Sequence, residues 1–216
     1  MRIIPWVLAV LSVVSAAAAI SVVYRDRKLY ALLKPLTTVL IIGVAVTAAG
    51  KLGFFQIAVA VGLVFCLLGD IFLLSDATFL PGLVSFLLAH LCFIAGFVYL
   101  NESSAGAMSQ AWLLIPLAAY GAGVYVILAP HLGKMKLPVV VYMTAILVMA
   151  WQALTVGILS GGWGLLVAAG GVLFVISDST LAYNRFRRQF MPAEVIILST
   201  YWAAILLIAI GIRVAG

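Results

Sequence analysis

LVFCLLGDIFLL, residues 63–74, is an apolar run that contains a single carboxylate, Asp70. VLFVISDSTLA, residues 172–182, holds Asp178 in a similar apolar setting. A charged side chain at the centre of a membrane-spanning helix costs about 2.5 to 3.5 kcal/mol on insertion scales, so such a residue usually marks a functional site. The two apolar runs therefore indicate membrane-spanning helices, and their aspartates indicate a functional site.

The composition of the chain is that of a membrane protein. Of its 216 residues, 67% are hydrophobic and 8% are charged, and the mean hydropathy is +1.32. A soluble domain of this length cannot bury so much apolar surface, whereas each membrane-spanning helix needs about 20 mainly apolar residues. The sequence predicts an all-α polytopic bundle of eight transmembrane helices, at about 3–23, 31–50, 54–75, 79–100, 110–129, 137–158, 161–183 and 193–214. The short connections leave no room for a soluble domain, so residues 1–216 are predicted to form one integral membrane domain.

The basic residues predict the orientation of the bundle, because Lys and Arg gather in cytoplasmic connections. The connections that follow the odd-numbered spans carry Arg25, Arg27, Lys28, Lys134, Lys136, Arg185, Arg187 and Arg188. The opposite side has Arg2, Lys51 and Arg213. Both termini are therefore predicted outside, in a multi-pass protein of the bacterial cell membrane. The net charge of +6 is split among the connections, which indicates contact with membrane lipids and not with nucleic acid.

Two short patterns near the predicted outer side have alternative interpretations. The first span resembles a secretory signal, because Arg2 precedes an apolar stretch that ends in the small residues SAAAAI. The stronger basic cluster YRDRK follows that span, and this order favours a membrane helix. NES at 101–103 fits a glycosylation sequon.

The two halves of the chain can be laid over each other. At an offset of 108 residues Asp70 matches Asp178, and an offset of 103 matches Pro35 with Pro138. The candidate repeats are about 1–100 and 110–216. Four helices in each half give both copies the same orientation, so the sequence predicts a parallel 4+4 duplication about a pseudo-two-fold axis along the membrane normal. Such an axis could bring the two aspartates face to face; the alternative is coincidence in a chain of few residue types.

Helix geometry places the two aspartates at matching depth. Asp70 lies 16 residues into its span and Asp178 lies 17 residues into its own, which is about 24 Å from the outer end at about 1.5 Å per residue. Lys34, Tyr142 and Tyr201 are also predicted within the cytoplasmic halves of their helices, with His90 nearer the middle. The sequence thus predicts one polar cavity that opens toward the inner leaflet.

Paired carboxyl groups suit acid and base chemistry. In one poorly solvated cavity, two carboxyl groups divide into one protonated and one ionised group, and hydrolysis by a general acid and a general base needs this division. Alternatively, the aspartates tie helices together through Lys34, Tyr142 or Ser177.

Two further chemistries use His90. Asp70, Asp178 and His90 could hold a metal, although the chain has no HxxxH or HExxH spacing, so no metal is expected. A serine nucleophile would be Ser85 or Ser177 beside His90, but no GxSxG motif is present. His90 is equally well explained as a hydrogen-bonded core residue.

Lys34 and Arg185 are predicted at the cytoplasmic rim of the bundle. They fit either anchors that snorkel to the interface or a clamp for the phosphate of a lipid head group. Tyr142 and Tyr201 have the same two interpretations, because aromatic hydroxyls are common near membrane interfaces.

Four stretches carry a resemblance to a known family. They are LLKPLTT at 32–38, LLGDIFLL at 67–74, FLPGLVSFLLAHLCFIAGF at 79–97 and GGVLFVISDSTLAYNRF at 170–186. In this order they resemble the successive motifs of the YhhN family of eight-helix membrane proteins, whose animal members are lysoplasmalogenases. The resemblance extends over about residues 30–205. One departure is Ile205, where the family pattern has a Gln.

The resemblance implies hydrolysis of the vinyl ether bond of a lysoplasmalogen, a lysophospholipid, to a fatty aldehyde and a glycerophospho-base, without a cofactor. Vinyl ethers hydrolyse by protonation of the alkenyl carbon and capture of the oxocarbenium ion by water, which agrees with a paired-acid site. Carried over by motif, Asp70 and Asp178 are the acid and base pair. The positioning or head-group residues are His90, Asn184, Lys34, Tyr142 and Tyr201, with Arg185 at the rim. Which aspartate is the acid stays open.

The rival interpretation is a small-molecule or lipid transporter that uses the same aspartates for proton coupling. A carrier needs access from both faces, whereas the polar residues cluster toward the predicted cytoplasmic side, which favours the enzyme. In a structural or sensing protein the aspartates would only tie helices together. The sequence does not define the head group of the substrate or the oligomeric state.

Overall fold

The computed structural model describes residues 3–48, 53–106 and 108–214, a part of the chain that contains helices and no strand. Eight helices are long and apolar enough to cross a membrane, which confirms the predicted all-α bundle of a multi-pass integral membrane protein. They are α1 Ile4–Val22, α2 Arg27–Ala48, α3 Phe54–Phe72, α4 Phe79–Ser104, α5 Leu114–Leu128, α6 Lys136–Ser160, α7 Gly162–Phe186 and α8 Ala193–Val214. Short 3₁₀ helices are η1 Asp76–Thr78, η2 Ala111–Leu113, η3 Ala129–His131 and η4 Gly133–Met135. Arg2, Lys51 and the side chain of Arg213, which enter the predicted orientation, lie outside the described residues.

The helix bounds differ from the prediction where side chains cap or extend a helix. α2 begins four residues early, because the Asp26 carboxylate accepts the backbone N–H groups of Lys28 and Leu29, each at 3.0 Å. α4 continues past residue 100 and includes Asn101, whose amide donates to the Gln152 side-chain oxygen at 2.7 Å. The interpretation of NES as a glycosylation site is wrong, because Asn101 is 1% exposed and its amide is engaged inside the bundle.

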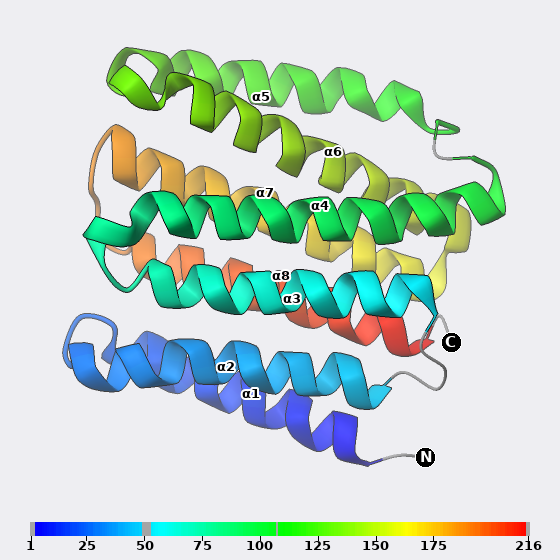
Figure 1. Cartoon of the computed structure of the whole chain (residues 1–216), viewed down its shortest axis with the longest axis horizontal. Coiled ribbons are helices and arrows are strands. Elements are labelled where there is room, and N and C mark those ends of the chain that lie inside the picture. Colours follow the sequence, from blue (N-terminus) through cyan, green and yellow to red (C-terminus); the bar gives the residue numbers. More distant parts are fainter. Residues whose placement is uncertain (1–2, 49–52, 107, 215–216) are drawn as a thin grey trace.

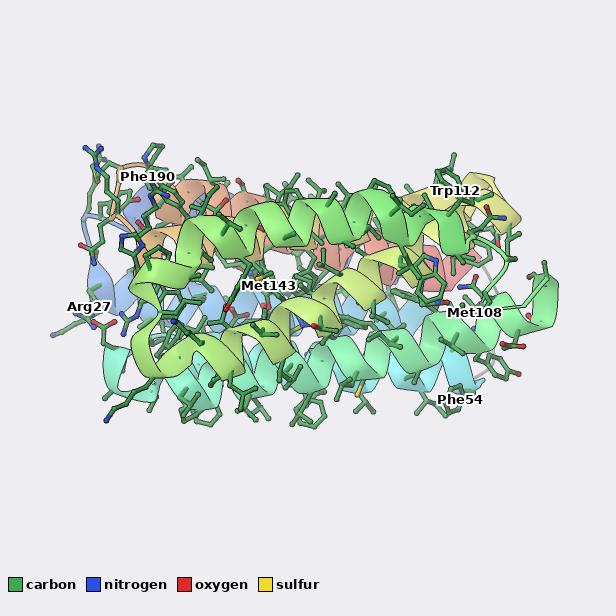
Figure 2. All side chains as sticks on the ribbon, turned by 90° about the horizontal axis from the view of Figure 1, so that it is seen from above. Arg27, Phe54, Met108, Trp112, Met143 and Phe190 are labelled. Carbon is green, nitrogen blue, oxygen red and sulfur yellow. The ribbon has the colours of Figure 1, made fainter. Side chains whose placement is uncertain are left out.

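All connections that follow an odd-numbered helix lie at one end of the bundle (Figure 1). We call it the basic end; its connections comprise residues 23–26, 73–78, 129–135 and 187–192. The opposite end, where α1 begins and α8 ends, is called the terminal end. Figure 2 shows Arg27 and Phe190 at the basic end and Trp112 at the terminal end. The basic residues predicted to share one side of the membrane therefore share one end of the fold.

Six helices close a ring. α2 packs on α3, α3 on α4, α4 on α6, α6 on α7, α7 on α8, and α8 returns to α2. α1 packs outside the ring on α2 and α8, and α5 packs outside it on α6. α4 and α6 are therefore neighbours in the ring, although the peripheral helix α5 separates them in the sequence.

Glycines bring α7 close to both of its ring neighbours. A Cβ atom at Gly164 would lie 2.6 Å from the carbonyl oxygen of Val156 on α6, and a Cβ atom at Gly170 would lie 2.8 Å from the carbonyl oxygen of Ala204 on α8. Only glycine fits such contacts, and small residues are the usual means by which membrane helices pack closely. The helix that carries Asp178 is thus held at fixed distances on both sides.

α5 is the most loosely held helix of the bundle. It lies at the edge of the molecule (Figure 1), and 17% of its most apolar 18-residue window is buried, against 61% for the span that contains α6. Cavities lie along α5 on the side that faces α7 and on the side that faces α6. α5 covers the face of α7 that carries Ser179, the residue after Asp178, and Tyr120 of α5 is hydrogen bonded to Ser179.

Candidate active site

The side chain of Asp70 on α3 is surrounded by partners from α2 and α8. Thr38 and Tyr201 donate their hydroxyls to Asp70 Oδ2 at 2.6 and 2.9 Å. The Lys34 ammonium lies 3.8 Å from Oδ1, and Trp202 donates its indole N–H to the Thr38 hydroxyl at 3.4 Å. We call these five residues the Asp70 cluster.

The Asp70 cluster follows from the spacing of its residues. Lys34 and Thr38 are four residues apart on α2, so both face α3 from one side of the helix. Lys34 is 6% exposed and Asp70 is 1% exposed. Lys34 therefore lies inside the bundle and not at the rim where the sequence predicts it, because the buried carboxylate attracts its ammonium. The cluster ties α2, α3 and α8 together.

Asp178 on α7 has fewer partners, and they come from α6 and α4. Tyr142 donates its hydroxyl to Asp178 Oδ2, and His90 Nε2 lies 3.9 Å from the same oxygen. That distance is too long for a direct hydrogen bond. We call Asp178, Tyr142 and His90 the Asp178 cluster.

His90 is fully buried and carries two nitrogens that have no hydrogen-bond partner within the described part of the chain. Its ring packs edge-on against Tyr142 and Phe174, with centroids 5.3 and 4.8 Å away. A buried polar group without a partner is costly and needs an explanation. A reacting molecule between His90 and Asp178 would provide one, whereas a hydrogen-bonded core histidine would already have its partner.

A small cavity of about 50 Å³ reaches the Asp178 cluster. Asp178 and Tyr142 line it together with mainly apolar side chains from α4, α5, α6 and α7, and the Asp178 side chain is 12% exposed. Met143, another lining residue, is labelled in Figure 2. A carboxyl group at an apolar cavity is suited to meet the uncharged part of a lipid.

The two aspartates do not share a hydrogen bond or an ion pair in the described part of the chain. Phe174 lies between their partners: its ring centroid is 5.6 Å from that of Tyr201 and 4.8 Å from that of His90. Phe86 also packs against Tyr201 and Phe174. The predicted single polar cavity is thus two clusters joined by aromatic rings.

The remaining predicted site residues lie at the basic end. Arg185 pairs with Asp76 of η1 and stacks on Phe79, 4.7 Å from the ring centroid. Asn184 accepts the backbone N–H of Phe190 at 3.1 Å, which shapes the connection between α7 and α8. Both side chains are therefore engaged within the protein.

The alternative chemistries lack their residue sets in the described part of the chain. No group of three or more His, Cys, Asp or Glu there could hold a metal, so Asp70, Asp178 and His90 are not gathered as ligands. Ser177 donates to the carbonyl oxygen of Ile197 at 3.1 Å, away from His90. Neither Ser177 nor Ser85 is bonded to the histidine.

Three residues of this region were not predicted from the sequence: Thr38 and Trp202 of the Asp70 cluster, and Phe174, which lies between the two clusters. Thr38 could have been found from its i+4 spacing to Lys34 on a predicted helix. Trp202 and Phe174 carry no such signal, because their roles depend on contacts between helices far apart in the chain.

Comparison with known proteins gives the chain a family and relatives. A model described as the YhhN family matches residues 29–212. The chain is 33% identical over 143 residues to human lysoplasmalogenase TMEM86B, covering 66% of this chain and 58% of the relative. It is 36% identical over 135 residues to a lysoplasmalogenase of Mycobacterium bovis, covering 62% and 50%. Human lysoplasmalogenase TMEM86A is 33% identical over 159 residues, covering 70% and 63%. The chain therefore spans between half and two thirds of each of these relatives, and no solved structure matches it significantly.

Proposed function

Because the chain belongs to the YhhN family, we propose that it hydrolyses the vinyl ether bond of lysoplasmalogens with choline or ethanolamine head groups. The products are a fatty aldehyde and a glycerophospho-base. The observation that carries this proposal is the Asp178 cluster: the Asp178 carboxyl group lines an apolar cavity and lies 3.9 Å from the buried His90, which has no hydrogen-bond partner among the described residues. The reaction consumes one water and needs no cofactor.

The first step is transfer of a proton from Asp178 to the alkenyl carbon that is not bonded to oxygen. The double bond supplies the electron pair, and the carbon bonded to oxygen becomes an oxocarbenium ion. Asp178 is now a carboxylate beside this cation, and in an apolar site such a fixed negative charge stabilises the cation strongly. The hydroxyl of Tyr142 orients the carboxyl group, because it donates to Oδ2.

The second step is attack of water on the oxocarbenium ion. His90 Nε2 accepts a proton from this water, which gives a hemiacetal and an imidazolium. Asp178 then takes the hydroxyl proton of the hemiacetal while His90 returns its proton to the departing glycerol oxygen. The carbon–oxygen bond breaks, the aldehyde leaves, and both residues regain their starting protonation.

Asp70 is assigned a positioning role. The sequence predicts Asp70 and Asp178 as an acid and base pair, but Asp70 already accepts two hydroxyls and faces the Lys34 ammonium. Its cluster holds Tyr201, and Tyr201 packs on Phe174, which packs on His90. Asp70 therefore acts by positioning Tyr201, Phe174 and His90, and it does not contact the substrate.

The orientation proposed for this enzyme has both termini outside and the basic end in the cytoplasm of a bacterial cell. Arg25, Arg27 and Lys28 at that end are exposed, as expected of residues that meet anionic lipid head groups. The substrate would then enter from the inner leaflet.

The test is aldehyde release by the purified protein in lipid nanodiscs. We expect release from lysoplasmenylcholine and none from the 1-O-alkyl analogue, which has the same head group and chain length but no double bond to protonate. A 1-acyl lysophosphatidylcholine serves as a second control. Absence of aldehyde from the vinyl ether, or equal cleavage of the acyl lipid, would contradict vinyl ether hydrolysis. Proton-coupled lipid movement without hydrolysis would support the rival carrier.

A further inference from the structure

Two cavities continue each other along the face between α5 and α7. One, of about 500 Å³, lies at the basic end and is lined by residues that include Tyr120, Ser179 and Arg188. The other, of about 320 Å³, lies nearer the terminal end. Both are lined by Tyr120 and Ile176, so they meet at these residues. We call the combined space the α5–α7 groove.

The lining of the α5–α7 groove changes from polar to apolar along its length. The cavity at the basic end has an arginine and three side chains with hydroxyl groups from α7, Ser179, Thr180 and Tyr183. The cavity toward the terminal end is lined by Leu, Pro, Ala, Val and Ile side chains, with Tyr120 as its one polar contributor within the described residues. A groove of this kind matches an amphiphile that has an anionic head and one hydrocarbon chain.

The side chain of Arg188 differs from those of its neighbouring arginines in having no hydrogen-bond or ion-pair partner among the described residues, although the backbone N–H of Arg188 donates to the carbonyl oxygen of Tyr183. Arg185 pairs with Asp76, and Arg187 donates to the carbonyl oxygen of Ile127 at 3.4 Å. The Arg188 side chain is exposed and lines the groove. A guanidinium that is not neutralised within the protein is well suited to bind a phosphate.

At its polar-to-apolar junction the groove adjoins the cavity of Asp178. There Tyr120 donates its hydroxyl to the Ser179 hydroxyl oxygen at 2.8 Å, and Ser179 directly follows Asp178. Ser179 and Val124 line both the groove and the cavity of Asp178, so the Val124 side chain lies between the two spaces. The vinyl ether of a lysoplasmalogen is likewise the junction between the polar head and the hydrocarbon chain.

We propose that the α5–α7 groove binds one lysophospholipid, with its phosphate at Arg188 and its hydrocarbon chain toward the terminal end, and that displacement of Val124 admits its ether linkage to Asp178. The delivery of the ether linkage to Asp178 rests on the proposed function, whereas the binding of a lysophospholipid in the groove does not. The loose packing of α5 supports it, because a peripheral helix can move to admit the linkage without opening the ring.

Binding is measured with a lipid that cannot be hydrolysed. The probe is a saturated 1-O-alkyl lysophosphatidylcholine with a diazirine at the chain end, photocrosslinked to the full chain in nanodiscs. We expect labelled peptides from residues 113–120 and 172–176. Diacyl phosphatidylcholine in excess should not displace the probe, and neither should glycerophosphocholine. Labelling mainly at α1, or displacement by diacyl lipid, would overturn the proposal.

Matched variants separate the parts of the proposal. Arg188→Gln should weaken probe binding and raise KM about tenfold with kcat unchanged, whereas Arg25→Gln, an exposed arginine at the same end, should change neither. Ala182→Phe, at a residue that lines the cavity of Asp178 but not the groove, should abolish hydrolysis and keep binding. Val126→Phe, whose parent side chain is 70% exposed, serves as its control. Equal behaviour of Arg188→Gln and Arg25→Gln would overturn the phosphate assignment. If hydrolysis fails in wild type while the probe still labels the groove, the proposed reaction is wrong and the binding site stands.

Discussion

The Asp70 cluster and the Asp178 cluster are built from similar parts. In each, an aspartate meets a side chain of the preceding helix, Thr38 for Asp70 and Tyr142 for Asp178. Each aspartate also meets the last helix of the other half of the chain, through Tyr201 on α8 or His90 on α4. A parallel duplication predicts this arrangement, and the duplication stays a prediction.

The clusters differ in how completely each carboxyl group is partnered. Asp70 has two hydroxyl donors and an ammonium and is 1% exposed. Asp178 has one hydroxyl donor, a histidine too distant to bond, and a cavity. A fully partnered buried ion pair holds helices in place, whereas a partly partnered group beside a cavity is free to exchange a proton with a ligand. In the proposed mechanism, the same residue type therefore serves positioning in one half of the chain and chemistry in the other.

Replacement of Asp178 should have the largest effect on the reaction. In Asp178→Asn the amide cannot donate an acidic proton to carbon, so we expect aldehyde release to fall about 10² to 10⁴-fold. The amide oxygen still accepts the Tyr142 hydroxyl, and the folded yield and thermal unfolding should stay close to wild type. Near wild-type hydrolysis by this variant would remove Asp178 from the mechanism.

Replacement of Asp70 should have the largest effect on stability. Asp70→Asn leaves the buried Lys34 ammonium without its carboxylate, and breaking a buried pair in this way costs about 3 to 5 kcal/mol. We expect a lower unfolding midpoint in detergent titrations. The double variant Asp70→Asn with Lys34→Met should recover much of the loss, because it removes the stranded charge. A double variant no more stable than the single one would show that Lys34 and Asp70 are not coupled.

His90 offers an intermediate effect that distinguishes chemistry from packing. His90→Phe keeps an aromatic ring against Phe174 but removes both nitrogens, so we expect hydrolysis to fall about tenfold to a hundredfold with little change in stability. The measurement is kcat together with the unfolding midpoint. A stable variant with unchanged kcat would rule out proton acceptance by His90.

The two tyrosines give the smallest and most sharply contrasting effects. Tyr142→Phe should lower kcat about tenfold, because Asp178 loses the hydroxyl that orients it, and Tyr201→Phe should lower stability by about 1 kcal/mol, the net value of one hydrogen bond. Assay of both variants for kcat and for unfolding compares the clusters directly. An exchange of the two outcomes would reverse the roles assigned to them.

Hydropathy was sufficient to predict the eight spans, because burial in lipid acts on each helix separately. The contacts between helices were not predictable in the same way. The ring that leaves α5 outside depends on close approaches such as that of Gly170 to α8, which no periodicity encodes. Lys34 is the clearest case: its depth suggests a rim anchor, but its place inside the bundle depends on which face of α3 meets α2.

The central claim is that Asp178 reacts and Asp70 positions. The most direct measurement is turnover of lysoplasmenylcholine per folded molecule by Asp70→Asn and Asp178→Asn, assayed side by side with the folded fraction counted by size-exclusion chromatography. We predict that folded Asp70→Asn retains measurable aldehyde release and that folded Asp178→Asn does not. Equal loss of turnover by the two folded variants would contradict the division of roles and restore Asp70 as a direct partner in the chemistry.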